Sequence, residues 1–173
     1  MKKAFVCVGI ALVAALSMCG CSSGNTTEQP DSQAAEEQTS TSDAQPANDY
    51  LNGSEVQGFL TAAQNITDAH SALQDGDADT CLSLLDGATD ACKALSAMDD
   101  VPEVVSEVHE DFTKAGDAFQ TAAIGLMAGA MSDDPDARNN ALETTIQQIN
   151  DATEYLNDAT AAINRLPVKT SQQ

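Results

Sequence analysis

The chain has 173 residues and a formal net charge of −20, from 27 acidic and 7 basic residues. This length allows one domain of ordinary size. The negative charge repels the phosphates of nucleic acids and of anionic lipids, so it argues against a nucleic-acid-binding protein and against a basic membrane-surface helix. A protein partner with a basic surface is compatible with it.

The first 20 residues have the plan of a signal peptide. Lys2 and Lys3 form a short basic start, an apolar stretch runs from Ala4 to Met18, and small residues follow. The apolar stretch is shorter than the roughly 20 residues that a membrane-spanning helix needs. We therefore expect residues 1–20 to be a signal peptide that is removed on export.

The stretch "LSMCGCSS", residues 16–23, resembles the lipobox of bacterial lipoproteins. In that motif a small residue directly precedes the cysteine that becomes lipidated. Gly20 before Cys21 fits this position, whereas Met18 before Cys19 is too large for it. The two residues upstream of Met18 also suit the motif, so Cys19 is the alternative attachment site.

This resemblance implies that Cys21 carries a diacylglycerol and becomes the N-terminus of the mature protein. Two or three acyl chains together make a stable anchor, whereas one chain binds only marginally. The expected location is the extracytoplasmic face of the cell membrane. An ordinary secreted protein, cut nearby and without lipid, is the alternative.

Residues 21–49 are expected to be a disordered, polar and acidic linker. Ser, Thr, Gln, Glu and Ala dominate it, and no aromatic side chain, nor any aliphatic one larger than Ala, occurs from Ser22 to Asn48. Such a segment cannot bury enough apolar surface to offset the entropy of ordering. We interpret it as a spacer between anchor and domain; its Ser and Thr content also fits a glycosylated stalk.

Four helical patterns are expected between residues 50 and 167, followed by a short tail, residues 168–173. The first begins at Ser54, where "SEVQ" has the form of a capping box. The second begins near Asp77 and is interrupted by Gly87. Its start and its interruption make it the least regular of the four.

The third and fourth patterns are the most regular. In the third, Pro102 fits the first turn of a helix, with Asp99 or Asp100 as the cap. The fourth begins at Asp134 and Pro135 and repeats apolar residues at every seventh position. Apolar residues recur in the third at alternating spacings of four and three, namely Val101, Val105, Val108, Phe112, Ala115, Phe119, Ala122, Leu126 and Gly129.

Short connections make successive helices antiparallel, so the sequence predicts an all-α fold: an antiparallel up-down four-helix bundle behind a disordered N-terminal linker. The opening "VPEVVSEVHEDF", residues 101–112, and the Ala-rich heptads give the chain a resemblance to small helical lipoproteins of Gram-positive bacteria, actinobacteria included. The resemblance implies an anchored helical bundle outside the cell and no particular activity.

Cys81 and Cys92 are the other two cysteines of the expected mature chain. Along one continuous helix their spacing corresponds to about 16 Å. A disulfide permits only roughly 4.4–6.8 Å between Cα atoms. We therefore expect two buried thiols, since a disulfide would require the helix to fold back at Asp86 and Gly87.

Two weak patterns resemble ligand sites. The stretch "DGDADTCLSLLD", residues 75–86, has acids at positions 1, 3 and 5 of a calcium loop but lacks its Gly at 6 and Glu at 12. A helix cap with acids in the first turn is the favoured interpretation. His70 and His109, the two histidines, lack the Glu-x-x-His context of a bundle metal site and are expected on the surface or at the boundary of core and surface. Haem between a histidine and a methionine is the less favoured alternative.

The sequence therefore predicts a membrane-anchored extracytoplasmic lipoprotein, attached through Cys21, that serves as a binding, scaffold or sensory module through an acidic helical bundle. We expect no enzymatic activity, no catalytic residue, no cofactor and no nucleic-acid partner. The expected partners are the membrane and a protein with a basic surface. The alternative is a lipoprotein that binds a small ligand or a metal such as calcium.

Overall fold

The computed structural model describes residues 44–166, where the chain consists of helices and their connections, with no strand. The expected signal peptide, Cys21 and most of the linker lie outside the described residues, as does the C-terminal tail. The all-α prediction is confirmed. The elements are α1 (Ala44–Leu51), α2 (Ser54–Gln74), α3 (Ala78–Leu85), α4 (Ala88–Ser96), the 3-10 helix η2 (Glu103–Val105), α5 (Ser106–Ala130) and α6 (Pro135–Ile163).

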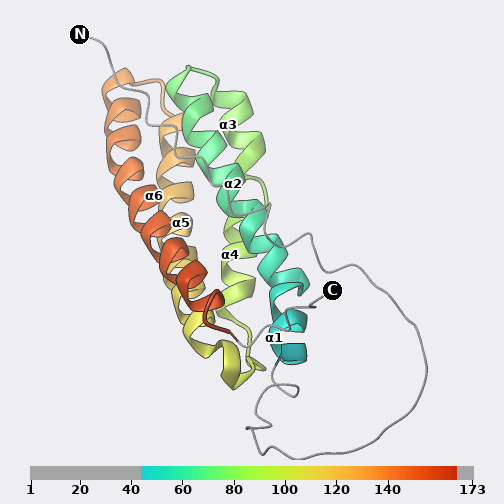
Figure 1. Cartoon of the computed structure of the whole chain (residues 1–173). Coiled ribbons are helices and arrows are strands. Elements are labelled where there is room, and N and C mark those ends of the chain that lie inside the picture. Colours follow the sequence, from blue (N-terminus) through green and yellow to red (C-terminus); the bar gives the residue numbers. More distant parts are fainter. Residues whose placement is uncertain (1–43, 167–173) are drawn as a thin grey trace, which may run out of the picture. The chain divides into compact units, whose positions relative to one another are not determined.

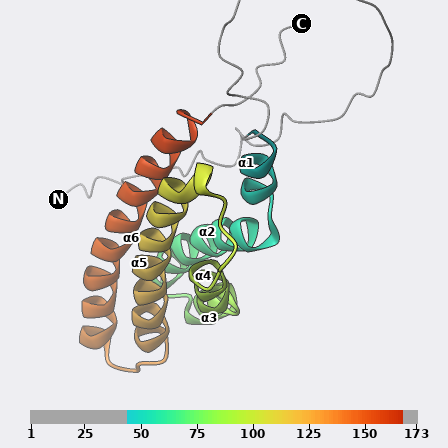
Figure 2. The same cartoon turned by 90° about the horizontal axis from the view of Figure 1, so that it is seen from below.

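The described helices form two groups that meet along α5. The long helices α5 and α6 lie antiparallel and make the most extensive contact (Figure 1). On the other side of α5, α2 packs against both α3 and α4. Figure 2 shows that α2 crosses the α5–α6 pair obliquely. The contact between α2 and α6 is accordingly small.

Three phenylalanines form the aromatic centre of the core, where α2 meets α5. Phe59 on α2 has its ring centroid 5.6 Å from that of Phe112 and 6.3 Å from that of Phe119, both on α5. All three side chains are fully buried. These tilted and edge-on arrangements are the favoured geometries for aromatic pairs. They join the two groups of helices.

The contact between α5 and α6 brings the two backbones unusually close. A Cβ atom added at Gly129 would lie 2.7 Å from the Cβ of Ala141, and one added at Gly125 would lie 2.7 Å from the Cγ2 of Thr145. Thr145 is buried, and its hydroxyl donates to the carbonyl of Ala141 at 2.8 Å. The two glycines therefore leave the space that the side chains of α6 fill.

The first helix, α1, corrects the expected end of the linker at residue 49. This helix begins at Ala44, and Pro46 is tolerated because it lies in the first turn. The helix is hard to predict from the sequence because it is short and mostly polar, and its two large apolar side chains, Tyr50 and Leu51, both stand at its end. Both of these large side chains are buried.

The second expected helix is in fact two. Gly87 adopts φ of +72°, the left-handed region that glycine enters without steric cost, and it separates α3 from α4. The third expected helix also starts later than predicted. Pro102 precedes the 3-10 turn η2, and α5 begins only at Ser106. Because the chain first makes this turn, neither Asp99 nor Asp100 caps α5.

The capping-box prediction at Ser54 is wrong. The cap position is occupied by Gly53, and the hydroxyl of Ser54 donates to its neighbour Glu55 at 2.9 Å. Gln57 does not fold back on its own helix but donates from Nε2 to the carbonyl of Leu51 at 2.8 Å. The presence of α1 explains this, because α1 ends in carbonyl groups that need a donor.

Two predicted caps are confirmed. The carboxylate of Asp77 accepts from the backbone N–H of Thr80 at 3.0 Å at the start of α3. At the start of α6, Asp134 accepts from the N–H of Asp136 at 2.9 Å, with Pro135 in the first position. Each side chain satisfies a backbone donor that the helix itself leaves free.

The close approach of α5 and α6 predicts opposite effects for two Gly→Ala substitutions. The methyl group added by Gly129→Ala would collide with Ala141 and push the two helices apart. This substitution should therefore lower the free energy of unfolding by about 1–3 kcal/mol. Gly58→Ala, inside α2 with nothing within 4 Å of the added atom, should raise it by about 0.5–1 kcal/mol. Urea denaturation followed by circular dichroism measures both. Equal effects of the two variants would contradict the close contact.

Candidate functional site

A shallow groove of about 380 Å³ lies between α2 and the break that separates α3 from α4. It exists because the chain turns at Gly87, which shifts α4 out of line with α3. Small residues make its floor: Gly58, Ala62, Ala88 and Ala91. The polar residues Gln57, Thr61, Asn65 and Asp86 line its sides.

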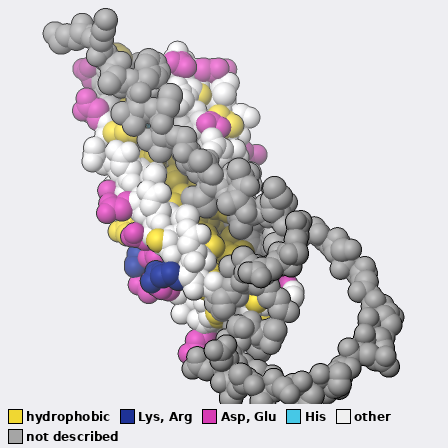
Figure 3. Space-filling view, in the orientation of Figure 1, with side chains coloured by type: hydrophobic (Ala, Val, Ile, Leu, Met, Phe, Trp, Pro, Cys, Tyr) yellow, Lys and Arg dark blue, Asp and Glu magenta, His cyan; other side chains and the backbone are white. Residues whose placement is uncertain are grey.

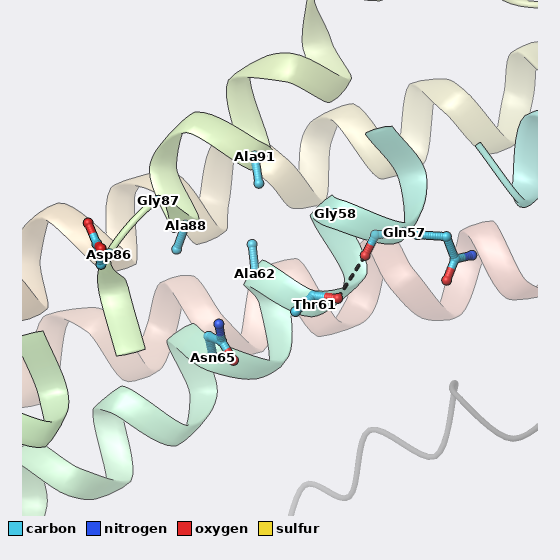
Figure 4. A pocket seen from close by; sticks show the side chains of 9 residues that line it. All are labelled: Gln57, Gly58, Thr61, Ala62, Asn65, Asp86, Gly87, Ala88 and Ala91. Atoms are coloured by element: carbon cyan, nitrogen blue, oxygen red, sulfur yellow. Dashed lines mark hydrogen bonds between the residues drawn. The ribbon is translucent and has the colours of Figure 1, made fainter. Parts of the chain in front are cut away.

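The polar groups of this groove do not converge on a common point. Figure 4 shows Asp86 at one end and Gln57 at the other, with the alanines between them. The hydroxyl of Thr61 is already used, because it donates to the carbonyl of Gln57 at 2.9 Å. Ligand sites usually bury most of their ligand and direct a few polar groups at it. This groove is instead open and shallow, so it provides a contact surface and does not enclose a ligand.

Cys81 on α3 and Cys92 on α4 are both buried and both free, as expected, although the continuous helix assumed for their spacing is broken at Gly87. Burial raises the pKa of the Cys92 thiol to about 11, and the charge of Asp117 adds to the effect. Burial, followed by the charge of Asp77, also raises the pKa of the Cys81 thiol. The thiolate is the reactive form of cysteine. Both side chains therefore behave as small apolar core residues.

The acidic stretch 75–86 is divided between a turn and a helix. The carboxylate of Asp77 accepts from both the backbone N–H and the hydroxyl of Thr80, at 3.0 and 2.7 Å, and these bonds hold its pKa below the ordinary value. The cap interpretation is therefore confirmed. Within residues 44–166 no group of three or more Asp, Glu, His or Cys residues is arranged to hold a metal ion.

The two histidines are half-buried and lie in different contacts, as expected for boundary positions. His70 on α2 has its Nε2 3.2 Å from the carbonyl oxygen of Leu142 on α6. His109 on α5 has its Nδ1 2.9 Å from the hydroxyl of Tyr50 on α1. Both contacts join residues far apart in the sequence, and no local pattern predicts either of them.

The outer face of α5 carries two exposed large apolar side chains. Ile124 is 54% exposed and Met131 76% exposed. They lie seven residues apart, which places them two turns apart on the same side of the helix. Asp117 precedes Ile124 by the same spacing and is exposed too. We call this surface the outer face of α5; it comprises Asp117, Thr121, Ile124, Ala128 and Met131.

Sequence reasoning missed the outer face of α5. Ile124 lies among the seam positions Phe119, Ala122 and Leu126 but is not one of them, so the heptad pattern makes no prediction for it. The signal that could have indicated this surface is a large aliphatic residue outside the seam of its own helix.

The surface of the described residues has few cations to balance its acids. Lys114 lies 2.8 Å from Glu110, and Arg165 lies 2.7 Å from Glu107. These pairs are exposed and contribute little stability. The remaining described cations are Lys93 on α4 and Arg138, which donates to the carbonyl of Ser132. In Figure 3, acidic side chains are spread along the visible face and the basic ones form one small group beside them.

The buried thiols predict slow alkylation of the folded protein. Iodoacetamide at neutral pH should modify Cys81 and Cys92 about 100-fold or more slowly than in urea, because each thiol reacts only after local opening. Residue-resolved mass spectrometry measures the two rates. Fast modification of either thiol without denaturant would contradict its burial. Recovery of a linked Cys81–Cys92 peptide would contradict the free state.

Comparison of the chain with protein-family models, with curated proteins and with solved structures finds no match in any of the three. Between residues 44 and 166, none of the helices has both the length and the apolar character needed to cross a membrane. Functional conclusions about this chain come from its own residues.

Proposed function

We propose that this protein is a lipid-anchored extracytoplasmic lipoprotein whose helical domain binds a protein partner with a basic surface. The diacylglycerol on Cys21 fixes its location. The linker gives the domain reach, and the acidic helical surface meets the partner. The role is that of a binding or scaffold module, with no catalysis of its own.

The anchor part of the proposal rests on the lipobox. Gly20 before Cys21, the apolar stretch behind Lys2 and Lys3, and the polar residues that follow together support it. A bacterial lipoprotein of this type needs no membrane-spanning helix, since its acyl chains supply the affinity for the bilayer.

We also propose that α2, the α3–α4 pair, α5 and α6 act as the four rods of an up-down bundle. Short connections between successive rods support this arrangement. They lie at residues 75–77, between α2 and α3, and at residues 131–134, between α5 and α6. The oblique crossing of α2 is then a distortion of the ideal bundle, and Phe59 contacts Phe112 of α5 in this arrangement.

The observation that carries the binding proposal is the outer face of α5. Ile124 on α5 and Met131 at its C-terminal cap expose apolar surface, and the exposed Asp117 lies two turns before Ile124 on the same side of the helix. Protein interfaces commonly combine apolar anchors with a polar rim that fixes orientation. A partner with an apolar depression surrounded by Lys or Arg would complement this face in both shape and charge.

Substitution of the two leader cysteines tests the anchor. Cys21→Ala should move the protein from the membrane fraction to the soluble fraction, because it removes the lipidated atom. Cys19→Ala is the matched control and should leave the protein on the membrane. Immunoblotting of fractionated cells reads out both variants. Release by Cys19→Ala alone would place the cleavage site two residues earlier, and release by neither would contradict lipid anchoring.

Site-specific photocrosslinking tests the outer face of α5. A photoreactive residue in place of Ile124 should capture a partner from native membranes, and the yield should fall as salt rises from about 0.05 M to about 0.5 M. The matched control places the same residue at Asn157, an exposed position on α6. Equal capture at both positions, or capture at Asn157 alone, would contradict this surface.

A further inference from the structure

The attachment of α1 to the rest of the described residues depends on few contacts. The helix has eight residues, and a helix this short is not stable by itself in water. A two-residue connection joins it to α2, which it also contacts, and it packs on η2 (Figure 2). Gln57 donates to the carbonyl of Leu51 across this connection. The helical form of α1 is therefore coupled to its docking.

Tyr50 is the large polar side chain at this docking surface. It lies in the last turn of α1, it is buried, and its hydroxyl lies 2.9 Å from Nδ1 of His109 in the first turn of α5. The two rings meet edge-on, with centroids 5.8 Å apart. Among the hydrogen bonds of the described residues, this is the one that the Tyr50 hydroxyl makes.

The chemistry of this bond depends on the charge of the imidazole. In neutral His109, with the proton on Nε2, Nδ1 has a lone pair and accepts the proton of the Tyr50 hydroxyl. In the imidazolium both nitrogens are donors, so the hydroxyl proton loses its acceptor. A buried donor without an acceptor is destabilising, and so is a charged imidazole that burial has partly removed from water.

Charged groups around the junction do not compensate for this loss. Asp49 accepts from Gln45 at 2.7 Å, Arg165 is held by Glu107 and Glu110 by Lys114, so these groups are engaged elsewhere. Burial alone lowers the pKa of His109 and raises that of Tyr50. The charged side chains of α1, of the first turn of α2, of η2 and of the first two turns of α5 are Asp49, Glu55, Glu103, Glu107, Glu110 and Asp111, and Arg165, just after α6, reaches this end of α5 through Glu107.

We propose that Tyr50 and His109 form a pH-sensitive latch: α1 is docked while His109 is neutral and comes free when His109 takes up a proton. The latch controls how firmly the segment that precedes α2 is held against the domain. It involves a hydrogen bond and a proton, with no covalent change.

The direction of the pH dependence follows from linkage. Docking favours the neutral imidazole, so the docked state binds fewer protons than the free state. The contribution of His109 to docking is complete above the ordinary histidine pKa of about 6.5. It is lost as the pH falls through the lower pKa of the docked state. Docking is thus strong at neutral pH and weak in mildly acidic surroundings.

Hydrogen exchange of the full chain in detergent tests the latch. Between about pH 7.5 and about pH 5, protection of the α1 amides should fall by up to about tenfold for each unit by which docking lowers the pKa of His109. Protection of α5 amides beyond the first turn should stay unchanged. Imidazole NMR signals give the pKa of His109 in the same samples.

His109→Gln removes the titrating group and should make the protection of α1 independent of pH over this range. His70→Gln is the matched control, since it removes the other histidine and should leave the pH dependence as in the parent protein. Tyr50→Phe keeps the ring and removes the hydroxyl, so it should lower α1 protection at neutral pH. Unchanged parent protection at about pH 5, or a pH dependence that survives His109→Gln, would overturn the latch.

Discussion

Helices with few large side chains can form a stable core only if their backbones come close together, and the described structure follows from this constraint. In the contact between α5 and α6, Gly125 and Gly129 leave room for Thr145 and Ala141. The three buried phenylalanines meet at one place, the Phe59 cluster between α2 and α5. The long α5 therefore packs against both groups of helices.

A core of this kind places possible functions on the surface. Close packing fills the described interior mainly with apolar side chains and two inert thiols, and its buried threonine, Thr145, is bonded to its own helix, so polar groups that are open to a partner lie at the edges. The outer face of α5 and the Tyr50–His109 contact are both edge features. One is a surface for a partner, and the other is a junction within the chain itself.

Much of the fold could be predicted from local patterns. Heptad spacing indicates which residues are buried, as the seam of α5 shows, and the caps Asp77 and Asp134 mark the starts of helices. Features that depend on tertiary neighbours could not be predicted. The sequence pairs Gln57 with its own helix, whereas its partner is a carbonyl of α1, a short and mostly polar helix that no local pattern indicates. The partnership of Tyr50 with His109 spans too much sequence for any local pattern. Cys21 lies outside the described residues, and its lipidation stays a prediction.

The break at Gly87 also bears on how such a domain can change over generations. The glycine is exposed, it joins two helices that are each anchored by their own buried residues, and an added Cβ would meet nothing within 4 Å. Exposed turns of this kind tolerate inserted residues, because few backbone contacts are lost. A loop grown here would extend over the groove between α2 and α4. The fold thus holds a position at which an enclosed binding site could arise without disturbing the phenylalanine cluster.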